Sequence, residues 1–220
     1  MKRHLKSTSL YGLVLAGGQS TRMRTDKSLL KYHGISQVEY CVKILSKICQ
    51  KIFVSNRKDQ TQNYVHRKYP QICDLLGNFG PIGGILSAMT NHPGAAWFVL
   101  ACDLPFVDAK VLTDLLKERN NRKMATAYLS THKASFPDPL CAIYEPNIFI
   151  KLLEFFGKGI YCPRQIFENL DINLIRQKNN ISLNNVNNRT DLFNALVRIK
   201  EKNEKNIFSS GQNIIKNKCV

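Results

Sequence analysis

The chain has 220 residues, of which 44% are hydrophobic and 22% are charged, so it is long enough for one domain with a substantial buried core. Its formal net charge of +16 suits a partner that carries several phosphates, whether a nucleotide, a phosphorylated small molecule or a nucleic acid, although a general drift toward lysine would give the same balance. The seven cysteines form no CxxC pair, which argues against a disulfide framework and a zinc site. No apolar run approaches the ~20 residues of a membrane span. Together these features favour a cytoplasmic location.

Short apolar runs alternate with amphipathic segments along the first 130 residues. We expect strands at 10–16, 51–55, 72–76, 95–101 and 123–129, and helices at 36–50, 82–90 and 108–119. The run 95–101 is the most apolar of all and predicts a central strand that is buried on both faces. This alternation predicts an α/β fold with a Rossmann-like, mainly parallel sheet and helices on both faces. Ligands of such sheets lie at the carboxyl ends of the strands.

The pattern changes after residue 131, where prolines become frequent. A strand is expected at 139–144 and a last amphipathic helix at 190–199, while residues 201–220 show little apolar periodicity. We therefore expect three parts: a basic N-terminal extension (1–9), one domain (10–200) and a loose basic tail (201–220).

Residues 15–27, LAGGQSTRMRTDK, are the first candidate site. Gly17 and Gly18 follow the first strand, and glycines let the main chain turn sharply and bring its N–H groups close to a phosphate. Arg22 and Lys27 could then neutralise a triphosphate. The spacing matches neither a P-loop nor a dinucleotide fingerprint. A Gly-Gly turn alone is usually structural, but the cations at this spacing favour a phosphate site.

Asp103 is the second candidate, because it directly follows the most buried strand. A carboxylate at the end of a central strand lies at the edge of the sheet where ligands bind. Mg²⁺ prefers one or two carboxylates together with substrate phosphates, so Asp103 suits such an ion. Aspartate is equally common as a turn-capping residue, and position alone leaves both interpretations open.

The motifs LAGGQSTRM…DK, GPIGG (80–84) and CDLP (102–105) resemble those of the molybdenum cofactor guanylyltransferases and their nucleotidyltransferase relatives. PLCAIY (139–144) is similar to the family's acceptor-side strand, and NVN (185–187) with DL (191–192) to its closing motif N-x-N-T-P-x-D-L. The resemblance implies a nucleotide-diphospho-sugar transferase type of fold. It also implies transfer of GMP from GTP to molybdopterin with Mg²⁺ and release of pyrophosphate, and a nucleotidyltransferase domain at 10–200.

The resemblance further implies roles for individual residues. The nucleotide-binding set is Leu15, Ala16, Gly17, Gly18, Lys27, Asn56, Asp74 and Asp103; the catalytic set is Lys27, Asp103 and Arg22; the acceptor-binding set is Arg164, Asn185 and Asn187. Asp103 is the implied metal ligand. Asn56 and Asp74 could equally be ordinary turn residues, the two acceptor-side asparagines could reflect an Asn-rich stretch, and Arg164 could be a surface cation.

The sequence departs from the family's pattern at Arg24, where the motif has glycine, and at Asn188-Arg189, where Thr-Pro is usual. These differences leave the acceptor open. The expected partners are a nucleoside triphosphate, a phosphorylated acceptor such as molybdopterin, and an enzyme that accepts the cofactor. Cytidylyl or sugar-1-phosphate transfer on the same scaffold is an alternative, as is a catalytically silent nucleotide sensor. A nucleic-acid binder is disfavoured because aromatic residues are not interleaved with the basic ones.

Overall fold

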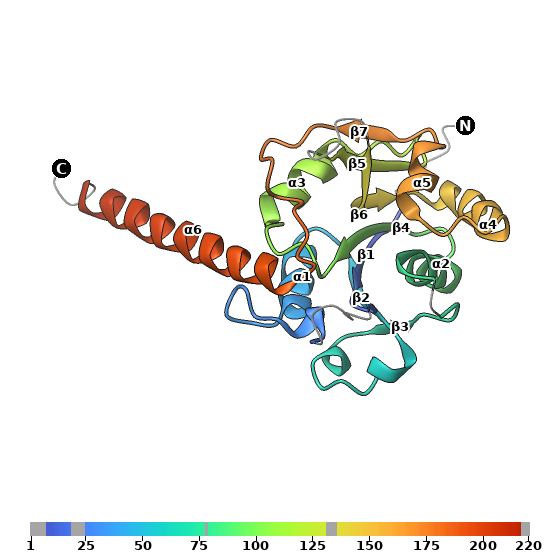
Figure 1. Cartoon of the computed structure of the whole chain (residues 1–220). Coiled ribbons are helices and arrows are strands. Elements are labelled where there is room, and N and C mark those ends of the chain that lie inside the picture. Colours follow the sequence, from blue (N-terminus) through green and yellow to red (C-terminus); the bar gives the residue numbers. More distant parts are fainter. Residues whose placement is uncertain (1–7, 19–24, 78, 131–135, 217–220) are drawn as a thin grey trace.

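The computed structural model describes residues 8–18, 25–77, 79–130 and 136–216. Within them, seven strands form one sheet in the order β3-β2-β1-β4-β6-β5-β7 (Figure 1). The strands are β1 (Leu10–Leu15), β2 (Lys51–Asn56), β3 (Gln71–Cys73), β4 (Ala96–Ala101), β5 (Ala125–Leu129), β6 (Pro137–Tyr144) and β7 (Asn173–Ile175). β4 lies centrally and every one of its residues is buried, as its uninterrupted apolar sequence predicts.

Strand directions make the sheet mainly parallel. β1 pairs in parallel with β2 and β4, β2 with β3, and β5 with β7, whereas β6 runs antiparallel to both β4 and β5. In the register of these pairs, Leu15 lies opposite both Ser55 and Ala101. The segments that follow β1, β2 and β4 therefore meet at one edge of the sheet.

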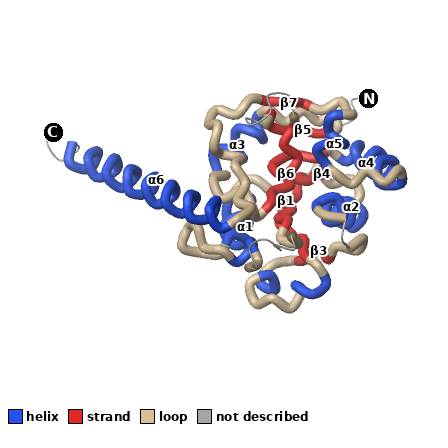
Figure 2. Tube along the Cα trace, in the orientation of Figure 1, coloured by secondary structure: helices blue, strands red, loops and turns tan. Residues whose placement is uncertain are grey.

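Helices cover both faces of the sheet (Figure 2). α1 (Gln37–Leu45) and α3 (Ala109–Lys117) bury their apolar sides in one core cluster, and α2 (Pro81–Asn91), α4 (Phe149–Gly157) and α5 (Pro163–Glu168) bury theirs in another. Local sequence fixes where they begin: Ser36 and Glu39 form a capping box on α1, and Pro81 occupies the first turn of α2. The predicted α/β class, with a mainly parallel sheet and helices on both faces, is confirmed.

The last helix differs from the expectation. α6 (Arg189–Lys216) continues well beyond residue 199 and extends away from the sheet, so residues 201–216 are helical rather than a loose tail (Figure 1). Apolar periodicity marks only the part of a helix that packs on a core. Residues 200–205 are mostly lysine and glutamate, which are good helix formers, so the helix continues past residue 199 without such a pattern. None of the described helices is long and apolar enough to cross a membrane.

Candidate nucleotide-binding site

A cavity of about 760 Å³ opens where β1, β2 and β4 end. Its size is in the range of small-molecule and cofactor sites. The lining residues are Leu15, Ala16, Gly17, Gly18, Asp26, Lys27, Ser28, Ser55, Arg57, Asp74, Gly77, Gly80, Pro81, Gly84, Ala101, Cys102, Asp103, Leu140 and Asn187. The register of the sheet, rather than nearness in sequence, brings these segments together.

The glycine turn enters this cavity directly from β1. Ala16 N–H donates to the Ser55 carbonyl at 2.8 Å, which fixes the start of the turn against β2. A Cβ placed on Gly18 would meet no described atom within 4 Å, and the backbone of Gly18 does not adopt the left-handed conformation. Among the described residues, neither packing nor a special φ therefore requires glycine at this position. Close approach of a ligand to the bare main chain does explain it.

Lys27 is placed by a short 3₁₀ helix, Lys27–Leu29, which Asp26 caps by accepting from Ser28 N–H at 2.9 Å. The ammonium group donates to Asn187 Oδ1 at 2.8 Å and lies 3.9 Å from Asp103 Oδ2. The first and second sequence motifs and the closing motif thus meet at one point. The backbone joins the last two as well, because Val186 N–H donates to the Asp103 carbonyl at 2.8 Å.

The Asp103 carboxylate fits a divalent cation. Its Oδ1 atom is buried and has no hydrogen-bond partner among the described residues. Burial raises the pKa of this carboxyl above its ordinary value, and the nearby Lys27 charge opposes that shift. The described residues contain no cluster of three or more His, Cys, Asp or Glu that could hold a metal. Mg²⁺ uses one or two carboxylates together with nucleotide phosphates, and Asp103 can supply one of these carboxylates.

The opposite wall is formed by the end of β3 and the start of α2. Asp74 accepts from the N–H groups of Leu76 and Gly77 at 3.0 and 3.1 Å, and burial raises the pKa of its carboxyl. Here α2 lies so close that a Cβ on Gly83 would come within 2.6 Å of the Asp74 carboxylate, and one on Gly84 within 2.4 Å of Ser55 Oγ. The two glycines of the GPIGG motif therefore permit this close approach of the helix.

Other residues of the predicted sets lie elsewhere. Asn56 is fully buried and does not line the cavity; its amide donates to Gln71 Oε1 at 2.5 Å. Arg164, on α5, and Asn185 are exposed and do not line the cavity. Arg164 does act on the acceptor-side strand: burial raises the pKa of Asp138 in β6, and the Arg164 charge lowers it. Arg22, the third member of the catalytic set, lies outside the described residues, as does Arg24.

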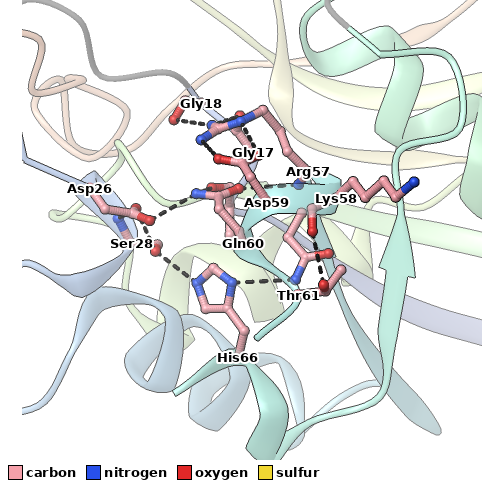
Figure 3. Close-up of polar contacts among 12 residues, drawn as sticks. Gly17, Gly18, Asp26, Ser28, Arg57, Lys58, Asp59, Gln60, Thr61 and His66 are labelled. Atoms are coloured by element: carbon pink, nitrogen blue, oxygen red, sulfur yellow. Dashed lines mark hydrogen bonds and ion pairs between the residues drawn. The ribbon is translucent and has the colours of Figure 1, made fainter. Parts of the chain in front are cut away.

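The sequence analysis did not identify the turn after β2 as part of the site. Arg57 lines the cavity and donates to the carbonyl oxygens of Gly17 and Gly18, and Gln60 donates to Asp26 Oδ2 at 2.8 Å (Figure 3). The available signal was the position of Arg57, which follows a parallel strand adjacent to β1. Its side chain must therefore start near the glycine turn.

A second connection runs through His66, which is buried. The Asn56 amide lies 3.4 Å from His66 Nδ1, and Nε2 lies 2.9 Å from Ser28 Oγ, whose hydroxyl donates to Asp26 Oδ1 at 2.7 Å (Figure 3). An amide that donates to Nδ1 leaves the proton on Nε2, so this chain of hydrogen bonds suits a neutral imidazole.

Residues 12–173 match the family of the MobA-like NTP transferase domain. The molybdenum cofactor biosynthesis bifunctional protein of Synechocystis sp. is 33% identical over 86% of this chain, and the chain spans only 54% of that relative's length. A Flavobacterium johnsoniae protein named probable molybdenum cofactor guanylyltransferase is 25% identical, over 84% of this chain and 95% of that protein.

A solved structure has the same fold. The crystal structure of molybdopterin-guanine dinucleotide biosynthesis protein A from Archaeoglobus fulgidus superposes with a TM-score of 0.71 at 25% sequence identity. The match covers 87% of this chain and 99% of that one. The described strands and helices of the present chain thus correspond to nearly the whole of that solved chain.

Proposed function

We propose that this chain, which belongs to the MobA-like NTP transferase domain family, transfers GMP from GTP to molybdopterin and releases pyrophosphate. The coarser part of this statement, a nucleotidyltransferase, follows from the family. The nucleotide and the acceptor are proposals that the names of the relatives from Synechocystis sp. and Flavobacterium johnsoniae support. The cytoplasm, where a nucleoside triphosphate is available, is the proposed location.

One observation carries the proposal: Lys27, Asn187 and Asp103 meet beside a bare glycine turn at the edge of the sheet. In the transfer, an acceptor phosphate oxygen forms a bond to the α-phosphorus as the bond to the β-phosphate oxygen breaks. Pyrophosphate leaves with the electron pair of that bond. Such reactions depend on positioning and charge neutralisation rather than on a protein nucleophile.

Each group in the cavity has a part in this chemistry. The main chain of Leu15 to Gly18 would face the nucleotide, and Lys27 would offset charge on the phosphates, assisted by Arg22. Asp103 would hold Mg²⁺, which supplies charge neutralisation at the phosphates when it is bound. Asp74 and the start of α2 would face the base and ribose. Asn56, which is buried and does not line the cavity, would act by supporting this wall through Gln71 and His66.

The acceptor would approach from the side of β6 and the closing motif. Asn187 lines the cavity at that side, and Leu140 of β6 does so too. Arg164 and Asn185, which are exposed and do not line the cavity, would contact the acceptor outside it. Delivery of the product to an enzyme that accepts the cofactor completes the proposed set of partners.

The test measures pyrophosphate release with a set of nucleoside triphosphates and a set of acceptors. Purified protein is incubated with Mg²⁺ and each of the four nucleoside triphosphates, with molybdopterin, a sugar 1-phosphate or no acceptor, and pyrophosphate is measured. We expect release only with GTP and molybdopterin. Release with CTP or with the sugar phosphate would establish another nucleotidyltransferase. No release with any pair, together with nucleotide binding, would establish a silent sensor.

A further inference from the structure

The side chain of Arg57 is hydrogen-bonded to the glycine turn. Its Nη1 atom donates to the carbonyl oxygens of Gly17 at 2.6 Å and Gly18 at 2.9 Å (Figure 3). Nε and Nη2 donate to the two carboxylate oxygens of Asp59 at 3.0 and 2.9 Å. Asp59 thus fixes one edge of the guanidinium while the other edge holds two consecutive carbonyls. A planar five-donor fork can do this, whereas a single ammonium group cannot.

Gln60 connects the turn after β2 (57–60) to both Ala16 and Asp26. Its Oε1 atom accepts from Arg57 N–H at 3.1 Å, and its Nε2 atom lies 3.2 Å from the Ala16 carbonyl and 2.8 Å from Asp26 Oδ2. Asp26 in turn caps the short helix that carries Lys27. The turn 57–60 is therefore bonded both where the glycine turn begins and where the lysine is placed.

These bonds decide which way the peptide groups face. Two successive glycines have the largest conformational freedom of any residue pair, so the turn needs an external tie to hold one conformation. A carbonyl oxygen that faces a phosphate repels it, whereas an N–H group attracts it. Four of the five guanidinium N–H groups are accounted for by Gly17, Gly18 and Asp59. The guanidinium of Arg57 thus forms its hydrogen bonds mainly within the protein rather than with a ligand.

We propose that Arg57 is a positioning residue that holds the carbonyl groups of Gly17 and Gly18 away from the phosphates, so that the nucleotide meets an already ordered turn. This inference rests on the proposed function, since the phosphates belong to the nucleotide substrate. Arg57 acts through the turn and is not itself a catalytic residue.

The test compares Arg57→Ala, Arg57→Lys and the matched control Lys58→Ala, which removes an exposed neighbouring positive charge. Binding of GTP with Mg²⁺ is measured by calorimetry and the transfer by steady-state kinetics. We expect both Arg57 variants to bind GTP about tenfold more weakly, because a lysine restores the charge but not the fork. Lys58→Ala should stay within about twofold of the parent. Added guanidinium ion, but not methylammonium, should restore binding to Arg57→Ala.

The kinetic split separates positioning from direct contact. A positioning role raises KM for GTP and leaves kcat within about threefold at saturation, because bound nucleotide can order the turn itself. A fall in kcat by a hundredfold with unchanged KM would overturn the proposal and make Arg57 a transition-state contact. Full binding by Arg57→Lys would also overturn it, since charge alone would then suffice.

A second measurement needs no nucleotide. Hydrogen exchange of a peptide covering residues 10–18 in the free protein should be faster in Arg57→Ala than in the parent or Lys58→Ala, because the turn loses its tie. Unchanged exchange would overturn the inference and leave the proposed function intact. Failure of the parent protein to bind any nucleoside triphosphate would overturn the proposed function, and the exchange measurement would still decide whether Arg57 orders the turn.

Discussion

The carboxylate of Asp103 is the point at which function and stability oppose each other. It lies 3.9 Å from Lys27, yet one oxygen is buried and unbonded among the described residues, and burial raises the pKa of the group. A group whose pKa is raised by burial costs stability when it is charged. A bound cation would offset the cost of ionising this buried carboxyl.

Asp103→Asn tests this directly. We expect transfer to fall about a hundredfold or more, the usual scale for the loss of one main electrostatic contact. The unliganded variant should be more stable by about 1 kcal/mol, because a neutral amide is easier to bury, and a protein of this size would then melt about 2–4 °C higher. Pyrophosphate release and thermal unfolding without metal measure the two effects. A variant with normal turnover would remove the metal role, and a variant that melts lower would show that Lys27 depends on the charge.

The contact of Lys27 with Asn187 joins the nucleotide side of the cavity to the acceptor side. Both members of the pair face the same cavity, whereas Arg164 is exposed on α5. From the sequence, Asn187 and Arg164 belong to one acceptor-binding set. The geometry predicts that the two residues behave differently.

Arg164→Ala should lower transfer about tenfold and leave GTP affinity unchanged. Asn187→Ala should lower both, because it removes the partner of Lys27, and Lys27→Ala should weaken GTP binding about tenfold or more through loss of a charge-assisted hydrogen bond. Calorimetry of GTP binding, combined with KM for the acceptor, separates the three variants. If Arg164→Ala weakens GTP binding as much as Lys27→Ala, the division of the site is wrong.

Among the strands and helices, those with a clear hydrophobic pattern can be predicted from the sequence, and those without such a pattern cannot. β1 and β4 can be predicted because each is a short, strongly apolar segment that a glycine or an aspartate closely follows. β3 and β7 have three residues each and lie at the edges of the sheet, where no periodicity can develop, so β3 was predicted too long and β7 was missed. The turn after β2 was missed because its contacts with the glycine turn exist only once the parallel pairing is known.

His66 makes the stability of the folded protein depend on pH. Burial lowers the pKa of its imidazole below the ordinary value, although the Asp26 charge opposes the shift. As pH falls through about 6.5, the unfolded chain takes up a proton on this group before the folded protein does. Stability is therefore complete above that pH and declines as pH falls toward the folded pKa. Burial also lowers the pKa of His33, so this residue adds to the decline of stability with falling pH.

His66→Gln should flatten this slope, because glutamine does not titrate. The free energy of unfolding is measured by chemical denaturation at pH 7.5, 6.5 and 5.5 for the parent and for His66→Gln. His33→Gln, which removes the other histidine with a lowered pKa, is measured in the same way. We expect the parent to lose more stability than His66→Gln over this range, even if the variant starts lower. Parallel curves for the parent and His66→Gln would show that folding does not change the pKa of His66.

At the scale of the whole molecule, α6 consists of two unlike halves. The first half packs on the domain: Ala195 and Ile199 are buried against Tyr32 and Val186 in a small cluster of their own. Lys202 then forms an ion pair with Asp108 at 3.0 Å, near the N-terminus of α3. Beyond this point the helix extends away from the sheet (Figure 1). The expected domain boundary near residue 200 therefore coincides with the last described contact between α6 and α3, and it remains a prediction.

Two truncations test that boundary. A stop after Lys202 keeps Ala195, Ile199 and the ion pair, so we expect thermal stability within about 0.5 kcal/mol of the parent and unchanged GTP affinity. A stop after Asn194 removes both buried side chains and should cost about 2–5 kcal/mol, the scale of emptying large apolar contacts from a core. Because this cluster packs beside the segment that carries Lys27, the shorter protein should also bind GTP more weakly. Thermal unfolding and calorimetry measure both effects. A large loss of stability in the protein that stops after Lys202 would mean that residues 203–220 belong to the folded domain and that the boundary lies beyond residue 202.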